Sequence, residues 1–448
     1  MSPSEVLEKI LRVGKKLIPR KLFEWLQPIY HWKLALIGAI LYGFPSRKIR
    51  IVAITGTKGK TTTTEIVNSI LEEAGYKTAL SGTLRQKIGA DSRPNLYKMT
   101  TPGRFFLQRF LREAVDARCE WVVLELTSEA TKQFRHKFLE LDAFIFTNIA
   151  PEHLESHGGF DNYLEAKLSI ARALSKSSKR PRMLIANLDN EYGQKFYDIE
   201  ADAKAGVHIT DANPFTTSEN GSTFSFLGTQ MATKLSGRFN LENILCALHF
   251  ANLVGISMNI ASRGILKVDH VSGRAEIIHG ESFDVVIDYA HTPDSLKAIY
   301  ETFGTRRKIC VLGSCGGGRD TWKRPLMGEI ADRYCDKIIL TDEDPYEEDP
   351  RSIVDAVASG IKQKEKLEII MDRHVAIARA ISLARLEVQL PTLEVELPNP
   401  EFPNPTSPVV LITGKGTDPF IMQAGGKKLP WSDMEVTEGE LRKLLISN

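Results

Sequence analysis

The sequence lacks long hydrophobic runs, closely spaced cysteines and a dominant charge of one sign. Its longest apolar segment, residues 34–44, is far shorter than the roughly 20 residues that cross a bilayer, and no signal-peptide pattern is visible. The five cysteines include no CxxC pair, so we expect a reducing compartment and neither a disulfide framework nor a zinc site. The 58 Lys and Arg are balanced by 56 Asp and Glu, which excludes a dedicated nucleic-acid binder. We expect a soluble cytoplasmic protein without a nucleic-acid partner.

Positive charge is concentrated in the first 50 residues, which contain six lysines and four arginines against three glutamates. Apolar side chains recur on one helical face of residues 4–26, and Pro19 and Pro28 predict two or three short helices instead of one. Two interpretations stay open. The segment could lie as a basic amphipathic helix on the anionic inner face of a membrane, or its helices could pack on the following domain.

From residue 51, short apolar runs alternate with amphipathic stretches, which is typical of parallel sheets covered by helices on both faces. The alternation restarts after about residue 268. We therefore predict an α/β protein with a short helical segment (1–50), a central doubly wound, mainly parallel sheet domain (51–268) and a C-terminal Rossmann-like domain (269–448). Residues 391–408 contain six prolines and are predicted to be an extended surface excursion. The predicted strands are 51–55, 121–126, 143–147, 183–186, 284–287, 308–313, 337–341, 367–371 and 409–413.

The strongest motif is Gly56-Thr-Lys-Gly-Lys-Thr-Thr62, which follows a predicted strand and opens a predicted helix. Backbone N–H groups of such a turn wrap phosphates, and the helix N-terminus adds a favourable dipole. Lys60 would reach the β- and γ-phosphates, and the Thr61 hydroxyl would bind Mg²⁺. The usual spacing places another glycine where Ile54 stands, so the loop is a shortened variant of the P-loop. We predict a nucleotide-phosphate site.

Three more side chains stand at positions of interest. Glu125 lies at the end of an apolar strand, where ligands gather in a doubly wound sheet, and an acid beside a nucleotide suits magnesium. The alternative for Glu125 is a carboxylate paired with a buried base. His153 and Lys167 follow along the chain, and spacing alone would make Lys167 an ordinary solvated helix lysine.

Taken together, these segments resemble the Mur ligase superfamily of ATP-dependent, amide-forming ligases. Within it, the likeness is to the tripeptide synthetases of peptidoglycan synthesis. The resemblance covers residues 51–448 and implies that ATP converts a carboxylate of UDP-MurNAc-L-Ala-D-Glu into an acyl phosphate, which a free amino acid then attacks. The segments that carry it are the shortened P-loop, the Glu125 strand, the ordered string Asn148, His153, His157 and Lys167, and the segments 100–102, 288–293 and 315–328.

The resemblance also implies individual roles. Lys167 would be carbamylated by CO₂, which turns a cation into a magnesium ligand. The catalytic residues would be Lys60, Glu125, His153 and Lys167, and two Mg²⁺ would be held by Thr61, Glu125, His153 and Lys167. ATP would contact Gly56, Thr57, Lys58, Gly59, Lys60, Thr61, Thr62, Asn148, Asn240, Asn243, Asp288 and His291. The UDP-sugar dipeptide would contact Thr100, Thr101, Thr127, Gln133 and Arg135. The free amino acid would contact Arg319, the loop Glu343-Asp344-Pro345-Tyr346, Gly414 and Asp418.

Two features depart from the family pattern. Members carry an N-terminal domain that binds the uridine nucleotide, whereas only the basic helical segment precedes this P-loop. In the amino-acid loop, Tyr346 stands where diaminopimelate-adding members have an arginine, which removes a bidentate partner for a carboxylate. The acidic run 342–349 would suit an ammonium-bearing side chain such as lysine or ornithine, or it is a solvated loop.

We expect the ligase to be a monomer. Two other functions remain as alternatives. The first keeps the ligase chemistry with a different acceptor, as in folylpolyglutamate or cyanophycin ligases, or with a lipid-carried acceptor. The second is a nucleotide-binding adaptor, in contact with a membrane or a protein partner, that has lost catalysis. The presence of Lys60, Thr61, Glu125, His153 and Lys167 favours an enzyme, because an adaptor has no need of two metal sites.

Overall fold

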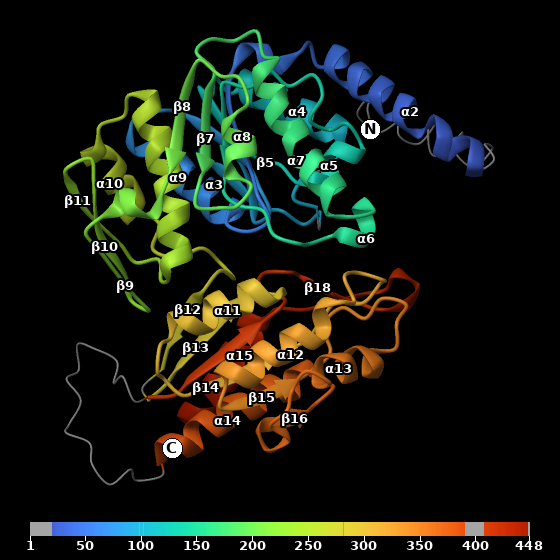
Figure 1. Cartoon of the computed structure of the whole chain (residues 1–448), viewed down its shortest axis with the longest axis vertical. Coiled ribbons are helices and arrows are strands. Elements are labelled where there is room, and N and C mark those ends of the chain that lie inside the picture. The colour runs from blue at the N-terminus through green and yellow to red at the C-terminus, as the bar shows by residue number, and fades with distance from the viewer. Residues whose placement is uncertain (1–19, 98, 102, 281, 390–406, 447–448) are drawn as a thin grey trace.

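The computed structural model describes residues 20–97, 99–101, 103–280, 282–389 and 407–446 (Figure 1). A central α/β unit lies above a C-terminal α/β unit in the view of Figure 1, and helix α2 extends from the edge of the central unit. Within these ranges, none of the helices combines the length and the apolar character that a membrane span requires. The α/β fold with two sheets confirms the predicted fold class.

The central sheet has eight strands in the order β4-β3-β2-β5-β1-β6-β7-β8. Six neighbouring strands from β2 to β8 are parallel, and β3 and β4 are antiparallel. Because the chain moves from β1 to β2 on one side and later to β6 on the other, the carboxyl end of β1 is a topological switch point. The strands are β1 (Arg50–Thr55), β2 (Thr78–Ser81), β3 (Arg85–Ile88), β4 (Asp91–Pro94), β5 (Trp121–Glu125), β6 (Ala143–Phe146), β7 (Met183–Asn187) and β8 (Ala203–Val207).

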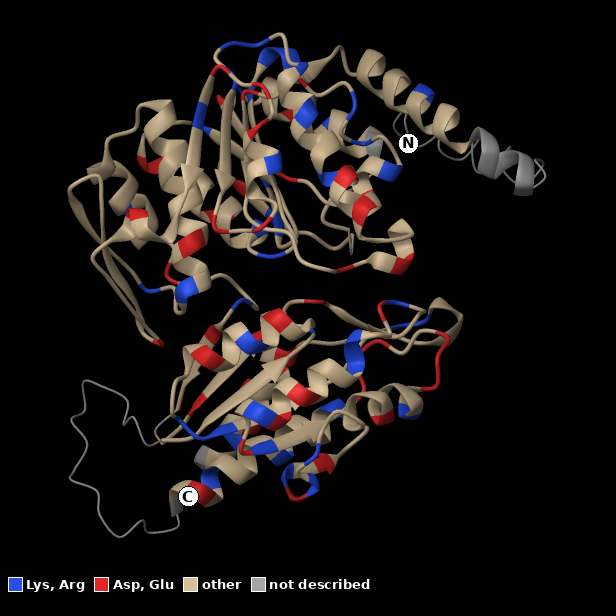
Figure 2. Ribbon diagram, viewed as in Figure 1, with Lys and Arg blue, Asp and Glu red and all other residues tan. Residues whose placement is uncertain are grey.

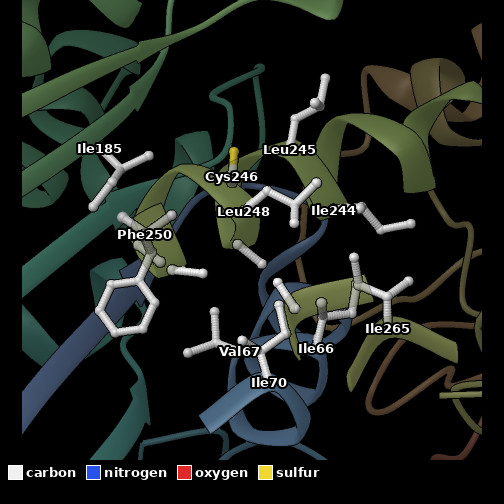
Figure 3. Close-up of a cluster of buried hydrophobic side chains, with 14 of the residues drawn as sticks. Ile66, Val67, Ile70, Ile185, Ile244, Leu245, Cys246, Leu248, Phe250 and Ile265 are labelled. Atoms are coloured by element: carbon white, nitrogen blue, oxygen red, sulfur yellow. The ribbon is translucent and has the colours of Figure 1, made fainter. Parts of the chain in front are cut away.

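Two apolar cores sandwich this sheet because successive strand residues point to opposite faces. In β1, Val52 and Ile54 join the core under α3, α9 and α10, whereas Ile51 and Ala53 join the core under α4, α7 and α8. Figure 3 shows the first core, where α3 and α9 pack through branched aliphatic side chains. The helices are α3 (Lys60–Glu73), α4 (Arg104–Asp116), α5 (Ser128–Lys132), α6 (Leu154–His157), α7 (Phe160–Ser175), α8 (Gly193–Tyr197), α9 (Arg238–Val254) and α10 (Met258–Leu266).

The C-terminal sheet has six strands in the order β12-β13-β17-β14-β15-β16, all parallel except β12. Its strands are β12 (Glu276–His279), β13 (Asp284–Asp288), β14 (Lys308–Leu312), β15 (Lys337–Leu340), β16 (Leu367–Ile369) and β17 (Val409–Thr413), and its helices are α11 (Pro293–Thr302), α12 (Lys323–Tyr334), α13 (Pro350–Ala358), α14 (Arg373–Gln389) and α15 (Asp433–Ile446). Smaller antiparallel sheets comprise β9 (Phe215–Ser218), β10 (Gly221–Phe226) and β11 (Thr229–Thr233), and β18 (Phe420–Met422) with β19 (Lys428–Pro430).

All nine predicted strands are present, with ends that agree to within two residues. The predicted domain limits remain predictions: β1 begins at Arg50, and α10 ends at Leu266. Most of the proline-rich excursion, 390–406, lies outside the described residues, as do Pro19 and the first half of the N-terminal segment.

The prediction that Pro28 ends a helix is wrong. Helix α2 runs from Arg20 to Leu41 with Pro28 inside it. A proline removes one backbone hydrogen bond, and the helix beyond it is held by packing of Leu34, Ala35 and Ala39, with α4 as its neighbour. The part of α2 beyond Pro28 therefore packs on the following domain, whereas residues 4–19 of the predicted amphipathic segment lie outside the described residues.

The expectation that the cysteines form no disulfide is also wrong. Cys310 and Cys335 are bonded, and both are buried. Cys310 lies in β14 and Cys335 lies just before the neighbouring strand β15, with α12 between them in the chain. Their 25-residue separation gave no sign of this contact, because it depends on the parallel pairing of the two strands.

Candidate active site

The loop between β1 and α3 has the form of a phosphate-binding turn. Gly59 has φ +80°, and an added Cβ would lie 2.0 Å from the Asn243 side chain, so only glycine fits. No side chain caps α3, which leaves the N–H groups of its first turn free for an anion. The Lys60 ammonium group folds back over the turn and donates to the carbonyls of Gly56 and Thr57, each at 2.9 Å. A polyphosphate would offer this amine stronger, charged acceptors.

Side chains after β6 hold this turn in place. The Asn148 side chain accepts from the Lys58 N–H at 2.9 Å and donates to the Lys58 carbonyl at 3.1 Å. The Thr147 hydroxyl donates to the same carbonyl at 2.7 Å. Asn148 therefore supports the backbone of the turn from the neighbouring strand.

Glu125 lies at the carboxyl end of β5, buried beside the turn. Its carboxylate accepts from the Thr61 hydroxyl at 3.2 and 3.3 Å and from the N–H and hydroxyl of Thr83 at 2.9 and 3.0 Å. In the described part of the chain, no three His, Cys, Asp or Glu side chains gather closely enough to hold a metal by themselves. The hydroxyl and carboxylate oxygens of Thr61 and Glu125 nevertheless fit Mg²⁺, which takes few protein oxygens together with substrate phosphates.

Lys167, on α7, is buried directly behind the turn. Its ammonium nitrogen donates to the Gly56 carbonyl at 2.7 Å and lies 4.8 Å from the centre of the Tyr163 ring. Burial, with the nearby charges of Lys60 and Lys58, holds the pKa of Lys167 well below its usual value. The amine is therefore biased toward its neutral form, and the prediction from spacing alone that Lys167 is solvated is wrong.

Glu152, which the sequence analysis overlooked, connects the turn to the C-terminal unit. Its carboxylate lies 3.0 Å from the Lys58 ammonium nitrogen and 2.7 Å from Nε2 of His291. Burial would raise the pKa of Glu152, but Lys58 and His291 outweigh it and hold that pKa well below its usual value. Burial lowers the pKa of His291 to about 4. The one available clue was the position of Glu152 beside His153.

These groups open into a cleft of about 1300 Å³ between the carboxyl ends of both sheets. Glu343, of the predicted amino-acid loop, lines it as well, as do Arg274 and Asp320, for which the sequence predicts no individual role. Gly56, Thr101, Gln133, Arg135, Lys167 and Asn240 lie outside its lining. The cleft brings together these predicted residues: Thr57, Lys58, Gly59, Lys60, Thr61, Thr62, Thr100, Glu125, Thr127, Asn148, His153, Asn243, Asp288, His291, Arg319, Asp344, Tyr346, Gly414 and Asp418.

The residues predicted for the acceptor lie beside Glu125. The Thr101 hydroxyl donates to the Glu125 carbonyl at 3.1 Å and accepts from the Thr127 N–H at 3.2 Å. The Arg135 guanidinium group donates to the Thr101 carbonyl and, at 2.7 Å, to the Gln133 side chain. Arg135 is thus tied to the backbone of this wall, behind the cleft surface.

The acidic run 342–349 is neither a free anionic patch nor a solvated loop. Lys415 lies 2.9 Å from the Asp344 carboxylate and 3.0 Å from that of Asp418, which offsets part of their charge. Glu348 pairs with Arg324 at 2.8 Å. These acids therefore form ion pairs that stabilise the conformation of the loop itself.

Glu343 is the exception within this run. It is buried in the cleft wall, and its Oε2 has no hydrogen-bond partner among the residues that the structure describes. A Cβ at Gly414 would lie 2.1 Å from that oxygen, so the glycine makes room for the carboxyl group. Burial raises the pKa of Glu343 to about 7. On the opposite side of the loop, the Arg319 guanidinium group stacks on the Tyr346 ring at 5.0 Å.

Comparisons with known proteins agree with this geometry. Residues 54–251 match the Mur ligase middle domain, and residues 273–388 match the Mur ligase, glutamate ligase domain. The UDP-N-acetylmuramoyl-L-alanyl-D-glutamate--2,6-diaminopimelate ligase of Syntrophomonas wolfei is 37% identical over 367 residues, which cover 79% of this chain and 74% of that protein. The ligase of the same name from Aquifex aeolicus is 33% identical over 409 residues, or 89% of this chain and 78% of that protein.

Solved structures show the same arrangement. A UDP-N-acetylmuramoyl-L-alanyl-D-glutamate--2,6-diaminopimelate ligase superposes with a TM-score of 0.57 at 25% identity, covering 89% of this chain and 79% of that one. Folylpolyglutamate synthase from Mycobacterium tuberculosis, at 15% identity, shares the fold with a TM-score of 0.65 over 85% of this chain and 91% of that one. With both domain matches in order along the sequence, the chain belongs to the Mur ligase family.

Proposed function

We propose that this protein is an ATP-dependent ligase that adds an amino acid to UDP-MurNAc-L-Ala-D-Glu, with release of ADP and phosphate, in peptidoglycan precursor synthesis. One observation carries the proposal. A phosphate-binding turn in one α/β unit faces Arg319, Glu343 and Tyr346 of the other across a single cleft. Relatives at 37% and 33% identity bear the name of that ligase.

The chemistry needs positioning and charge compensation more than acid–base groups. The γ-phosphoryl group of ATP passes to the acceptor carboxylate and forms an acyl phosphate; the amine of the amino acid then attacks the acyl carbon, loses a proton and expels phosphate. Lys60 and the N–H groups of the turn stabilise the charge on the phosphoryl oxygens. Mg²⁺ bound by Thr61 and Glu125 would supply further charge compensation there.

Lys167 supports the carbamate part of the proposal. A neutral amine attacks CO₂ to give a carbamate and a proton, and the lowered pKa of Lys167 provides that neutral amine. The carbamate would be an anionic oxygen donor behind the turn, and with Glu125 and His153 it would hold the second of two Mg²⁺. In this form a buried cation becomes a metal ligand, which explains a lysine beside a polyphosphate.

We propose that the added amino acid carries an ammonium-bearing side chain. Glu343 is the buried carboxyl group whose oxygen is left without a partner in the cleft wall. An ammonium group beside it would stabilise its charged form. The amino acids this favours are lysine, ornithine and diaminopimelate.

The test is phosphate release by the full chain with ATP, Mg²⁺ and UDP-MurNAc-L-Ala-D-Glu, with lysine, ornithine or diaminopimelate supplied in turn. Release that depends on one amino acid supports the ligase and identifies its substrate. Lys167→Ala serves as the inactive control. No release with any amino acid, from protein that binds ATP, would contradict this acceptor and favour a different one.

We also infer that α2 lies on the anionic inner face of a membrane, with the protein otherwise cytoplasmic and monomeric. One side of α2 packs on the central unit, but the opposite side exposes large apolar residues, among them Ile29, Ile37 and Ile40 at 52%, 42% and 58% exposure. No acidic residue occurs between positions 25 and 64, and the part of α2 that is not grey in Figure 2 is mostly uncharged. Apolar area next to basic residues is the pattern of interfacial helices.

Flotation with vesicles tests this placement. The full chain should float with phosphatidylglycerol-containing vesicles, less with pure phosphatidylcholine and less at high salt. The triple variant I29S/I37S/I40S should lose flotation, whereas V375S/L386S/L429S, which removes three exposed apolar residues elsewhere, should retain it. A wild-type dimer that the α2 variant converts to monomer, without any flotation, would assign the face to a second copy and overturn the inference.

A further inference from the structure

Two non-glycine residues with left-handed backbones face each other across the cleft. His153 has φ +59° and Asp320 has φ +42°. Side chains with a Cβ adopt this region at a cost, and such residues persist only where the surroundings hold them. His153 belongs to the central unit and Asp320 to the C-terminal unit, so each is held by contacts from the other unit.

The contacts between them are reciprocal. The Asp320 carboxylate accepts from the N–H of His153 at 2.6 Å and from the N–H of Leu154 at 2.9 Å. In return, the Glu155 carboxylate accepts from the N–H of Asp320 at 2.5 Å and from that of Thr321 at 3.3 Å. Asp320 is 2% exposed, so its bonds are shielded from water. Charge-assisted bonds of this kind are stronger than neutral ones.

A second link joins the same segment to the C-terminal unit. Glu152, the residue before His153, lies between Lys58 of the phosphate-binding turn and His291. The C-terminal unit therefore contacts the segment 152–155 at two points: His291 contacts Glu152, and Asp320 contacts the backbone of His153 and Leu154.

We propose that Asp320 is a positioning residue for the ligase reaction: its carboxylate fixes the backbone of His153, and so aims the His153 ring into the cleft, only when the C-terminal unit is docked. This inference rests on the function proposed above. The His153 ring is thereby placed beside the phosphate-binding turn only when the C-terminal unit, which carries Arg319 and Glu343, is docked. In a form with the C-terminal unit undocked, His153 would not be correctly placed, and bound ATP would be hydrolysed only slowly.

The test compares Asp320→Ala, Asp320→Asn and Asp349→Asn in the full chain. Asp349 also accepts a backbone N–H at a helix start, from Ser352 at 3.0 Å, but within one unit, so it is the matched control. Asp320→Ala should lower kcat at least tenfold and change KM for ATP less than threefold, because the Lys60 turn is intact. Asp320→Asn, which keeps one acceptor oxygen, should fall between Asp320→Ala and wild type.

Small-angle X-ray scattering provides a readout that does not need turnover. With Mg²⁺ and a non-hydrolysable ATP analogue, Asp320→Ala should remain more extended than wild type and Asp349→Asn. Equal scattering and kcat in Asp320→Ala and Asp349→Asn would overturn the inference. If wild type releases no phosphate, the ligase proposal fails, whereas the scattering comparison still decides whether Asp320 joins the two units.

Discussion

Replacing Lys167 with methionine should abolish ligation and yet stabilise the folded protein near neutral pH. The side chain is 1% exposed, and its amine donates a hydrogen bond to Gly56. Methionine fills nearly the same volume without a titratable group. In wild type, the unfolded chain binds a proton at Lys167 more readily than the folded chain does, which favours unfolding. The methionine variant has no such group, and its free energy of unfolding should therefore be higher.

The magnitude follows from proton linkage. The folded-state pKa of Lys167 is lowered by burial and the neighbouring Lys60, so below the unfolded pKa of about 10.4 the unfolded chain binds a proton that the folded chain does not. Wild type should therefore lose about 1.4 kcal/mol of stability per pH unit as pH falls toward the folded-state pKa. The methionine variant avoids this loss and forfeits one hydrogen bond worth about 1 kcal/mol.

Urea unfolding of both proteins at pH 7, 8 and 9 measures the difference. Buffers must be free of CO₂, because a carbamate would replace the amine with an anion. Lys176→Met, at the exposed end of α7, is the control for loss of one lysine. A stability difference between Lys167→Met and wild type that does not change with pH would refute the neutral amine and, with it, the reasoning for carbamylation.

Four other outcomes are expected. Gly59→Ala forces a Cβ against Asn243 and costs about 1–2 kcal/mol of backbone strain, so equilibrium ATP binding should weaken about tenfold or more. Arg373 pairs with the buried carboxylate of Asp433 at 2.8 Å, and Arg373→Met leaves that buried charge without its cation. The free energy of unfolding in urea should therefore fall by about 3–5 kcal/mol. Glu343→Gln should raise KM for the diamino acid while leaving KM for ATP unchanged. In wild type, KM for the diamino acid should fall as pH rises through 7, because the Glu343 carboxyl, with its pKa raised to about 7, ionises there.

The local features of this fold could be predicted from the sequence, and the features that depend on distant contacts could not. Strand β1 and the turn after it are encoded by a buried run followed by glycines and a lysine, and both lie where the pattern placed them. Pro28 was misjudged because its helix is held by packing, which a local rule does not include. The disulfide between Cys310 and Cys335 was missed because strand pairing brings them together.

The site shows the same division. The phosphate-binding turn was found from motif spacing. Glu152 and Asp320 lie inside segments that carry the family resemblance, but their individual roles could not be predicted, because each contacts a residue far away in the sequence. For the acidic run 342–349, the sequence predicts either a site for an ammonium-bearing side chain or a solvated loop. Lys415 and Arg324, from other parts of the chain, form ion pairs with two of its acids, Asp344 and Glu348. Counting charges along a sequence cannot show which of them are already paired.

Strand β17 has a consequence for synthesis of the protein. It consists of residues 409–413 and yet lies in the middle of the C-terminal sheet, between β13 and β14. Until the ribosome has made it, the strands on either side have no common partner and present unpaired edges. The central unit can fold while synthesis continues, whereas the C-terminal sheet can close only once residues 409–413 have emerged. A chain cut short after α14 would keep the phosphate-binding turn but would leave its C-terminal strands exposed to aggregation and to proteases.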